Sequence, residues 1–146
     1  MINIGIDPGK SGGIAVIWPA GKPHAFKMPE TDADLFDALR EIKRHSVAED
    51  VPCRAALEKV HSMPGQGVTS SFTFGQGYGA LKMALTALGI PYVDVTPQKW
   101  QGAIGCMTKG DKNVSKAKAQ AMFPEIKITH AIADALLIAE WCRRQK

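Results

Sequence analysis

The chain has 146 residues, of which 45% are hydrophobic and 22% charged, so we expect a single packed domain over residues 1–146 rather than a disordered chain. No apolar run is long enough to span a bilayer, and residues 1–7 hold no cationic segment followed by an apolar one, which argues against a membrane protein and a signal peptide. Three cysteines without tight spacing argue against a disulfide framework or a CxxC metal site, and we expect a cytoplasmic protein with free thiols.

The first part of the chain predicts three strands. Isoleucines at alternate positions from Ile2 to Ile6 are typical of a strand, and this strand ends on a carboxylate, Asp7. Strands are predicted at residues 2–7, 14–18 and 24–27, with turns at 8–13 and 21–23. Short turns between successive strands favour an antiparallel meander.

Helices and strands alternate in the rest of the chain. Thr31 is a candidate N-cap for a helix in which apolar residues recur at helical spacing. A strand is predicted at 54–60, followed by a Gly/Ser/Thr/Pro-rich loop from 61 to about 71 and a second helix that ends at Gly89. The next strand is predicted at 91–95, and Thr96-Pro97 is the expected N-cap and first helical residue after it. Two helices are predicted after the strand at 91–95, one before Pro124 and one over about 129–143. The order βββαβαβαα implies an α/β fold, with a mixed sheet and helices on its faces.

Three acidic residues interrupt apolar segments. Asp7 ends the first strand, Glu58 lies in the strand sequence Ala-Ala-Leu-Glu-Lys-Val, and Asp134 lies near the start of an almost wholly apolar helix. Carboxylates are rarely buried without a partner, and three of them can share one divalent cation. Hard oxygen ligands select Mg²⁺ or Mn²⁺, so the three acids together predict a metal site, although each alone fits an ordinary surface acid.

A histidine accompanies the third acid. His130 precedes Asp134 by four residues, a spacing that puts both side chains on one helix face. His130 is therefore a candidate metal ligand, proton donor or general base, and the alternative is a surface histidine at a helix start.

The net charge of +4 is concentrated in one segment. Six lysines and two acids lie between Thr96 and Ile128, so this segment carries +4 and the rest of the chain sums to zero. Either a polyanion partner or a solvated lysine-rich helix face explains this pattern. The candidate phosphate contacts are Lys99, Lys109, Lys112, Lys116 and Lys118.

Five motifs in chain order carry a resemblance to a known family. They are Ile4-Gly-Ile-Asp7-Pro-Gly, Leu57-Glu58-Lys-Val, Phe74-Gly75-Gln76-Gly-Tyr-Gly79, Thr96-Pro97 before a lysine-containing helix, and His130-Ala-Ile-Ala-Asp134-Ala-Leu. Together they resemble the RuvC family of Holliday junction resolvases, in the ribonuclease H-like (retroviral integrase) superfamily, especially its short phage-type members.

This resemblance implies a fold and an activity. The expected fold is ribonuclease H-like, with three layers and a mixed five-stranded sheet in which an antiparallel meander is joined by two parallel strands, with helices on both faces. The implied protein is a homodimeric, Mg²⁺-dependent endodeoxyribonuclease that makes paired symmetric nicks in four-way DNA junctions. Two Mg²⁺ per active site are expected, Mn²⁺ is a substitute, and no nucleotide cofactor is expected.

The same resemblance assigns roles to residues. Asp7, Glu58 and Asp134 match the family's catalytic, metal-binding acids, and His130 stands where many members have a fourth acid and some a histidine. His61 replaces the phenylalanine that wedges the junction open in typical bacterial members. Phe72 or Phe74 is an alternative wedge, or the wedge is absent. We expect DNA contacts from His61, Phe74 and Gln76.

A dimer interface is not fixed by the sequence. The small residues Gly75, Gly77, Gly79 and Ala80 at the start of the second helix permit close approach of another helix, and they equally suit packing on the sheet.

Other functions remain open at this stage. One is a different ribonuclease H-like nuclease that acts on flaps, branched DNA or RNA–DNA hybrids, and another is a junction-binding protein without activity. A small-molecule phosphotransferase is less favoured. The sequence Gly5 to Ser11 is one residue short of a P-loop, and no helix follows it.

Overall fold

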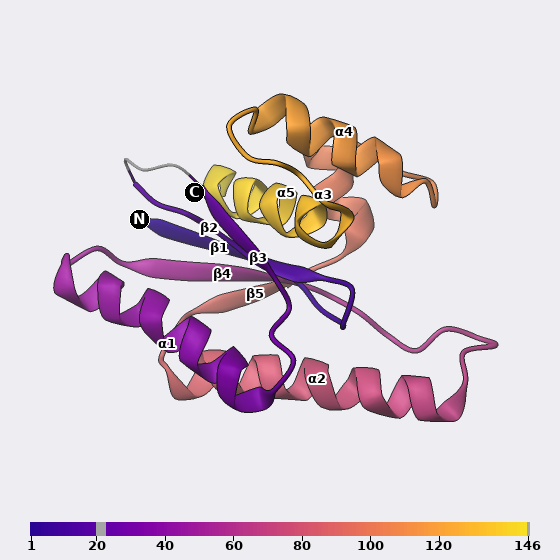
Figure 1. Ribbon diagram of the computed structural model, residues 1–146, viewed down its shortest axis with the longest axis horizontal. Helices are drawn as coiled ribbons and strands as arrows, with labels where there is room; N and C mark the ends of the chain where they lie inside the picture. The colour runs from indigo at the N-terminus through magenta and orange to yellow at the C-terminus, as the bar shows by residue number, and fades with distance from the viewer. Residues whose placement is uncertain (20–22, 146) are drawn as a thin grey trace.

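The protein is built on one five-stranded mixed sheet (Figure 1). The computed structural model describes residues 1–19 and 23–145, so the predicted turn at 21–23 lies largely outside the described residues. The strands are β1 (Ile2–Asp7), β2 (Gly13–Ile17), β3 (His24–Lys27), β4 (Cys53–Glu58) and β5 (Tyr92–Val95). Their order in the sheet is β3-β2-β1-β4-β5. The β1–β2 and β2–β3 pairs are antiparallel, whereas β1–β4 and β4–β5 are parallel, which confirms the expected meander with two added parallel strands.

Helices cover both faces of this sheet. They are α1 (Asp32–Ala48), α2 (Val68–Ala87), α3 (Pro97–Ile104), α4 (Lys112–Met122) and α5 (His130–Arg144). Helices α1 and α2 lie on one face, and α3, α4 and α5 lie on the other (Figure 1). No helix in the described part of the chain is both long and apolar enough to cross a bilayer.

Two helix starts agree with the predicted caps. The Thr31 hydroxyl accepts a hydrogen bond from the amide of Asp34 at 3.1 Å, and α1 begins at the next residue. The Thr96 hydroxyl accepts from the amide of Lys99 at 3.3 Å, and Pro97 is the first residue of α3. Both threonines satisfy an amide that has no partner inside its helix, which is why the helices begin there.

Three boundaries differ from the prediction. Strand β4 ends at Glu58 and not at residue 60, and α2 begins at Val68, inside the predicted loop. The Gly67 carbonyl already accepts the amide of Ser71, so the Ser/Thr-rich stretch forms the first turn of α2. Three helices follow β5, one more than predicted, because Gly105 adopts a left-handed conformation (φ 76°) that ends α3, and α4 starts afresh after its N-cap Asp111.

Strand alternation divides the interior into two cores. Ile2, Ile4 and Ile6 point toward α1 and α2 and belong to a core with Leu39 and Leu85. The intervening residues of β1, from Asn3 to Asp7, therefore point toward α5. The same alternation in β4 sends Ala55 and Leu57 toward α1 and α2, and Ala56 and Glu58 toward α5.

Helix α5 lies directly on the first strand. A Cβ atom added at Gly5 would come within 2.2 Å of both the carbonyl oxygen of Ala135 and the amide nitrogen of Ala139. The backbones of β1 and α5 are therefore in contact at this point, and only glycine permits it. This close packing fixes the height of α5 above the sheet and, with it, the position of Asp134 relative to Asp7.

Candidate active site

Two of the predicted acids lie next to each other at one edge of the sheet. Asp7 is the last residue of β1 and Glu58 is the last residue of β4. The parallel register pairs Ile6 with Leu57, so the two acids occupy the next positions on neighbouring strands, which lie about 4.8 Å apart in a sheet. Both point to the face that α5 covers.

The third acid, Asp134, lies on the helix that covers this face of the sheet. Asp134 lies just over one turn into α5, the helix that packs on β1, β2 and β4. Its charge acts on both Asp7 and Glu58. The structure therefore brings together three carboxylates that are far apart in the sequence.

Burial and mutual repulsion destabilise the charged forms of these acids. The pKa of Asp7 is raised well above its usual value, first because burial removes water from the carboxylate and then because Glu58 and Asp134 are negative neighbours. The pKa of Glu58 is also raised, mainly by burial. A cation bound among these carboxylates would favour their charged forms and so oppose both effects.

One oxygen atom of the three acids is a candidate metal ligand. Asp134 Oδ1 is buried and has no hydrogen-bond partner among the described residues. A buried carboxylate oxygen without a partner is costly, and a bound cation would satisfy it. The donor set of three carboxylates suits Mg²⁺ or Mn²⁺. Among the described residues, no three His, Cys, Asp or Glu side chains are arranged so that they could hold a metal ion without some rearrangement.

Sequence reasoning missed a tryptophan at this site. The indole Nε1–H of Trp100 donates a hydrogen bond to Glu58 Oε2 at 2.6 Å. Trp100 is fully buried in α3, 42 residues away along the chain. The one available signal was a large aromatic residue one turn after the Thr96 cap, whose N–H needs a partner when buried.

The predicted histidine lies at the edge of the site. His130 is the first residue of α5, one turn before Asp134, and its side chain is exposed. No hydrogen bond or ion pair among the described residues involves it. Its assignment as a ligand or proton donor stays a prediction.

The five candidate lysines lie in different parts of the structure. Lys112, the first residue of α4, acts on both Asp7 and Glu58, and its positive charge offsets a small part of the rise in their pKa values that burial and the neighbouring acids cause. Lys116 follows one turn later on the same helix face. Lys118 lies near Gly105 and Cys106, and Lys109 lies in the loop between α3 and α4. Of the five candidate lysines, Lys112 is thus the one whose charge acts on both Asp7 and Glu58.

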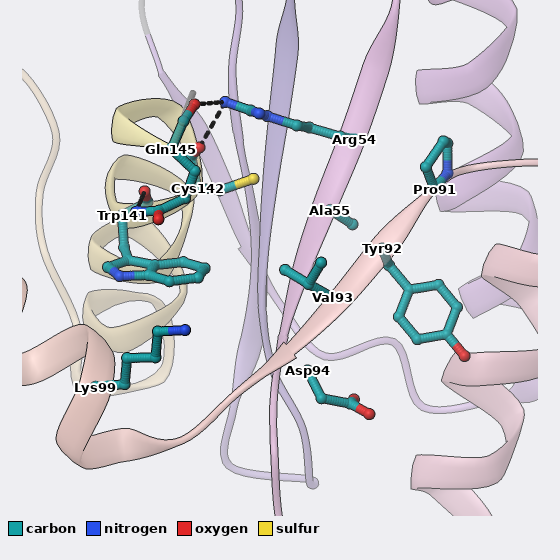
Figure 2. A pocket seen from close by; sticks show the side chains of 10 residues that line it. All are labelled: Arg54, Ala55, Pro91, Tyr92, Val93, Asp94, Lys99, Trp141, Cys142 and Gln145. Carbon is teal, nitrogen blue, oxygen red and sulfur yellow. Dashed lines mark hydrogen bonds between the residues drawn. The ribbon is translucent and has the colours of Figure 1, made fainter.

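Lys99 points to a different surface. Its amine lies 5.7 Å from the ring centre of Trp141. Both residues line a pocket of about 350 Å³ beside β5 (Figure 2). Arg54 lines the same pocket and donates to the carbonyl of Cys142 at 2.8 Å. None of the three acids lines this pocket, so the acids and Lys99 belong to separate regions.

The two alternative wedge residues lie in different places. The Phe74 ring covers Gly9, in the turn that follows Asp7, and lines a pocket of about 190 Å³ with His61. Phe72 is 67% exposed on another face of α2. Gln76 is also exposed. Of these predicted DNA-contacting residues, Phe74 therefore lies beside the turn that follows Asp7, with His61 in the same pocket, whereas Phe72 does not line it.

Solved structures share the fold of this chain. RuvC from Thermus thermophilus aligns with a TM-score of 0.64, over 97% of this chain and 92% of that chain, at 19% identity. The fold is that of RuvC. The T. thermophilus RuvC structure in complex with a Holliday junction substrate aligns with a TM-score of 0.62, at 18% identity, over 97% of this chain and 91% of that one. The expected ribonuclease H-like fold and the resemblance to RuvC are confirmed at the level of the fold.

Part of the chain is also similar in sequence to a Holliday junction resolvase. The chain is 32% identical over 85 residues to the chloroplastic Holliday junction resolvase MOC1 of Chlamydomonas reinhardtii. This match covers 54% of the chain, which spans only about a tenth of the length of that relative. No protein-family model matches the chain.

Proposed function

We propose that this protein is a Holliday junction resolvase, a divalent-metal-dependent endonuclease that makes paired symmetric nicks in four-way DNA junctions. The observation that carries the proposal is the cluster of Asp7, Glu58 and Asp134 at one edge of a RuvC-type sheet. Support comes from the likeness to RuvC bound to a Holliday junction and from the partial match to a resolvase.

The acids are the proposed metal ligands. Asp7 feels the negative charges of both Glu58 and Asp134, so we expect it to be the central residue of the set that would hold the metal. The unpartnered Oδ1 of Asp134 is a further ligand atom. Bound Mg²⁺ would supply an activated water and stabilise negative charge on the phosphate, leaving 5′-phosphate and 3′-hydroxyl ends.

Other residues would handle the substrate around that centre. Lys112 carries positive charge beside the acids and would attract the backbone of the strand to be cut. His130, exposed at the start of α5, is in a position to give a proton to a leaving oxygen or to complete the ligand set. The ring of Phe74 offers a stacking surface for a base at the junction centre.

The lysines of α4 should bind DNA through phosphates. Changing Lys112 and Lys116 to Gln is expected to weaken binding equally for junctions of any sequence. It should reduce the slope of log affinity against log salt by about 0.9 for each phosphate that the protein no longer neutralises. Fluorescence anisotropy over a range of salt concentrations measures this slope. Lys43→Gln, on α1 at the opposite face of the sheet, is the control, and an unchanged slope in the double variant would identify α4 as a plain solvated face.

Helix α2 offers a surface for a second copy of the chain. Val68, Phe72 and Met83 are 87%, 67% and 65% exposed, and they follow one another at helical spacing. Gly75 and Gly79 lie between them on the same stripe, with no atom of another element within 4 Å of a Cβ added there. The glycines are therefore not used for packing on the sheet, and the stripe is open to a helix from a partner protomer.

A charge in this stripe should separate the protomers. Phe72→Glu is expected to convert a dimer to a monomer, because it puts a carboxylate at the centre of an apolar contact. Sedimentation velocity measures the mass. The matched control is Val47→Glu on α1, where the native valine is 69% exposed and outside the stripe. A wild-type monomer at assay concentration, or a dimeric Phe72→Glu variant, would contradict the proposed interface.

Cleavage of a labelled immobile four-way junction tests the proposed function. We expect Mg²⁺-dependent nicks at symmetric positions on opposite strands, which DNA ligase can reseal because they carry 5′-phosphates. Duplex, flap and RNA–DNA hybrid substrates run in parallel. Equal cleavage of those controls would leave a metal nuclease without junction selectivity, and tight junction binding without cleavage in Mg²⁺ or Mn²⁺ would indicate a binding protein.

A further inference from the structure

The side chain of Trp100 joins two elements of the candidate active site. Its ring is fully buried against the core below α5, and its single N–H donates to Oε2 of Glu58 at 2.6 Å. No other hydrogen bond among the described residues reaches the Glu58 carboxylate. The second oxygen, Oε1, is thus left without a protein partner.

The local sequence explains why the indole arrives there. Glu58 is paired in register with Val95, the last residue of β5. Thr96 then caps α3, and the amide of Trp100 donates to the Thr96 carbonyl at 3.2 Å, which closes the first turn. One turn after the cap, the helix has returned to the end of β4, where Glu58 lies.

The chemistry of this bond is directional. Indole is a donor only, so it stabilises the carboxylate and cannot accept a proton from it. A hydrogen bond to an ionised acceptor is short and strong, and it restrains the oxygen that accepts it. The same bond lowers the pKa of Glu58, against burial and the charge of Asp134, which raise it.

We propose that Trp100 is a positioning residue that holds Glu58 by Oε2 and so presents Oε1 to a divalent cation shared with Asp7 and Asp134. This inference deepens the proposed function, because it assumes that the three acids bind Mg²⁺. Groups of this kind, which orient a metal ligand without touching the metal, typically change metal affinity or activity by about 10- to 100-fold when removed.

Trp100→Phe is the direct test, since phenylalanine keeps an aromatic ring but has no N–H. Calorimetric titration with Mn²⁺ should show affinity about tenfold weaker than wild type. Trp141→Phe is the matched control, because Trp141 is buried on the same side of the sheet and its indole donates no hydrogen bond to any described residue. This control should bind Mn²⁺ like wild type. A Trp100→Phe protein that melts earlier but binds Mn²⁺ normally would reduce Trp100 to a packing role.

A second measurement uses the wild-type chain and does not depend on folding of the variant. The measurement follows the indole N–H signals of the three tryptophans, Trp18, Trp100 and Trp141, by NMR while Mg²⁺ is added to the protein. The Trp100 signal should shift as Mg²⁺ binds, while those of Trp18 and Trp141 stay in place. A static Trp100 signal during a titration that moves backbone amides at the acids would overturn the inference.

These results separate the two proposals. If the Mn²⁺ affinities differ as expected but four-way junctions are not cut, the role of Trp100 stands and the resolvase assignment fails. If junctions are cut and Trp100→Phe matches wild type in both Mn²⁺ affinity and cleavage, the resolvase assignment stands and the role of Trp100 fails.

Discussion

Changing Asp7 to Asn should abolish junction cleavage while leaving junction binding intact. Asparagine keeps the size of the side chain but removes the charge at the centre of the acidic cluster, so the cations that carry the reaction are no longer held. We expect the cleavage rate to fall by about 10³-fold, the upper end of the loss when one electrostatic group is removed from an active site. Single-turnover cleavage and a binding assay in Ca²⁺ measure the two effects separately.

The same substitution has a second, opposite effect on stability. The folded-state pKa of Asp7 is raised above its ordinary value of 3.8, so the folded state binds this proton more tightly than the unfolded chain does. The stability that this provides is complete below pH 3.8 and is lost as pH rises through the raised pKa. Without divalent metal at neutral pH, Asp7→Asn should therefore melt at a higher temperature than wild type, and the difference should shrink in acid.

Thermal melts at several pH values, with and without Mg²⁺, test this pair of effects. Mg²⁺ should stabilise wild type more than Asp7→Asn, because only the wild-type cluster gains a cation. An Asp7→Asn variant that cuts junctions at the normal rate would show that the site has been assigned to the wrong residues.

Gly5→Ala should destabilise the fold by about 3 kcal/mol or more, at the upper end of the usual cost of overpacking. The new methyl group would meet the backbone of α5 at Ala135 and Ala139, at 2.2 Å from each. Backbone atoms cannot rotate away as a side chain can, so the whole helix must lift from β1. Because α5 carries Asp134, cleavage should also be lost in the fraction that remains folded.

Urea unfolding followed by circular dichroism measures the loss of stability. The control is Gly102→Ala in α3, where an added Cβ meets nothing within 4 Å. Alanine is favoured over glycine in a helix by up to about 1 kcal/mol, so this variant should match or exceed wild type in stability. Equal unfolding midpoints for Gly5→Ala and wild type would show that β1 and α5 are not in backbone contact.

The strands and the acids that end them could be predicted from local pattern. Alternating isoleucines define the face of β1, and the same alternation decides that Asp7 points away from them. Thr31 and Thr96 predict helix starts, because a threonine hydroxyl can accept a hydrogen bond from an amide of the first turn. Asp134 stands out because its neighbours in α5 are apolar. In each case the signal lies within a few residues of the feature.

Contacts between distant segments could not be predicted in this way. The bond between Trp100 and Glu58 depends on the pairing of β4 with β5, which no local periodicity encodes. Lys112 is one of several lysines in its segment, and only the packing of α4 brings it near the acids. The exposed position of His130 likewise depends on how α5 is rotated on the sheet.

The position of α5 has a consequence for synthesis of the protein. This helix is made long after β1, yet it packs on β1, β2 and β4 and supplies the third acid. Chains emerge from the ribosome at about 5–20 residues per second, so the sheet is exposed on one face for several seconds before α5 arrives. During that interval the acids of β1 and β4 have no third partner. A nascent chain therefore lacks the assembled cluster on which the proposed cleavage depends, and the cluster forms only when α5 docks.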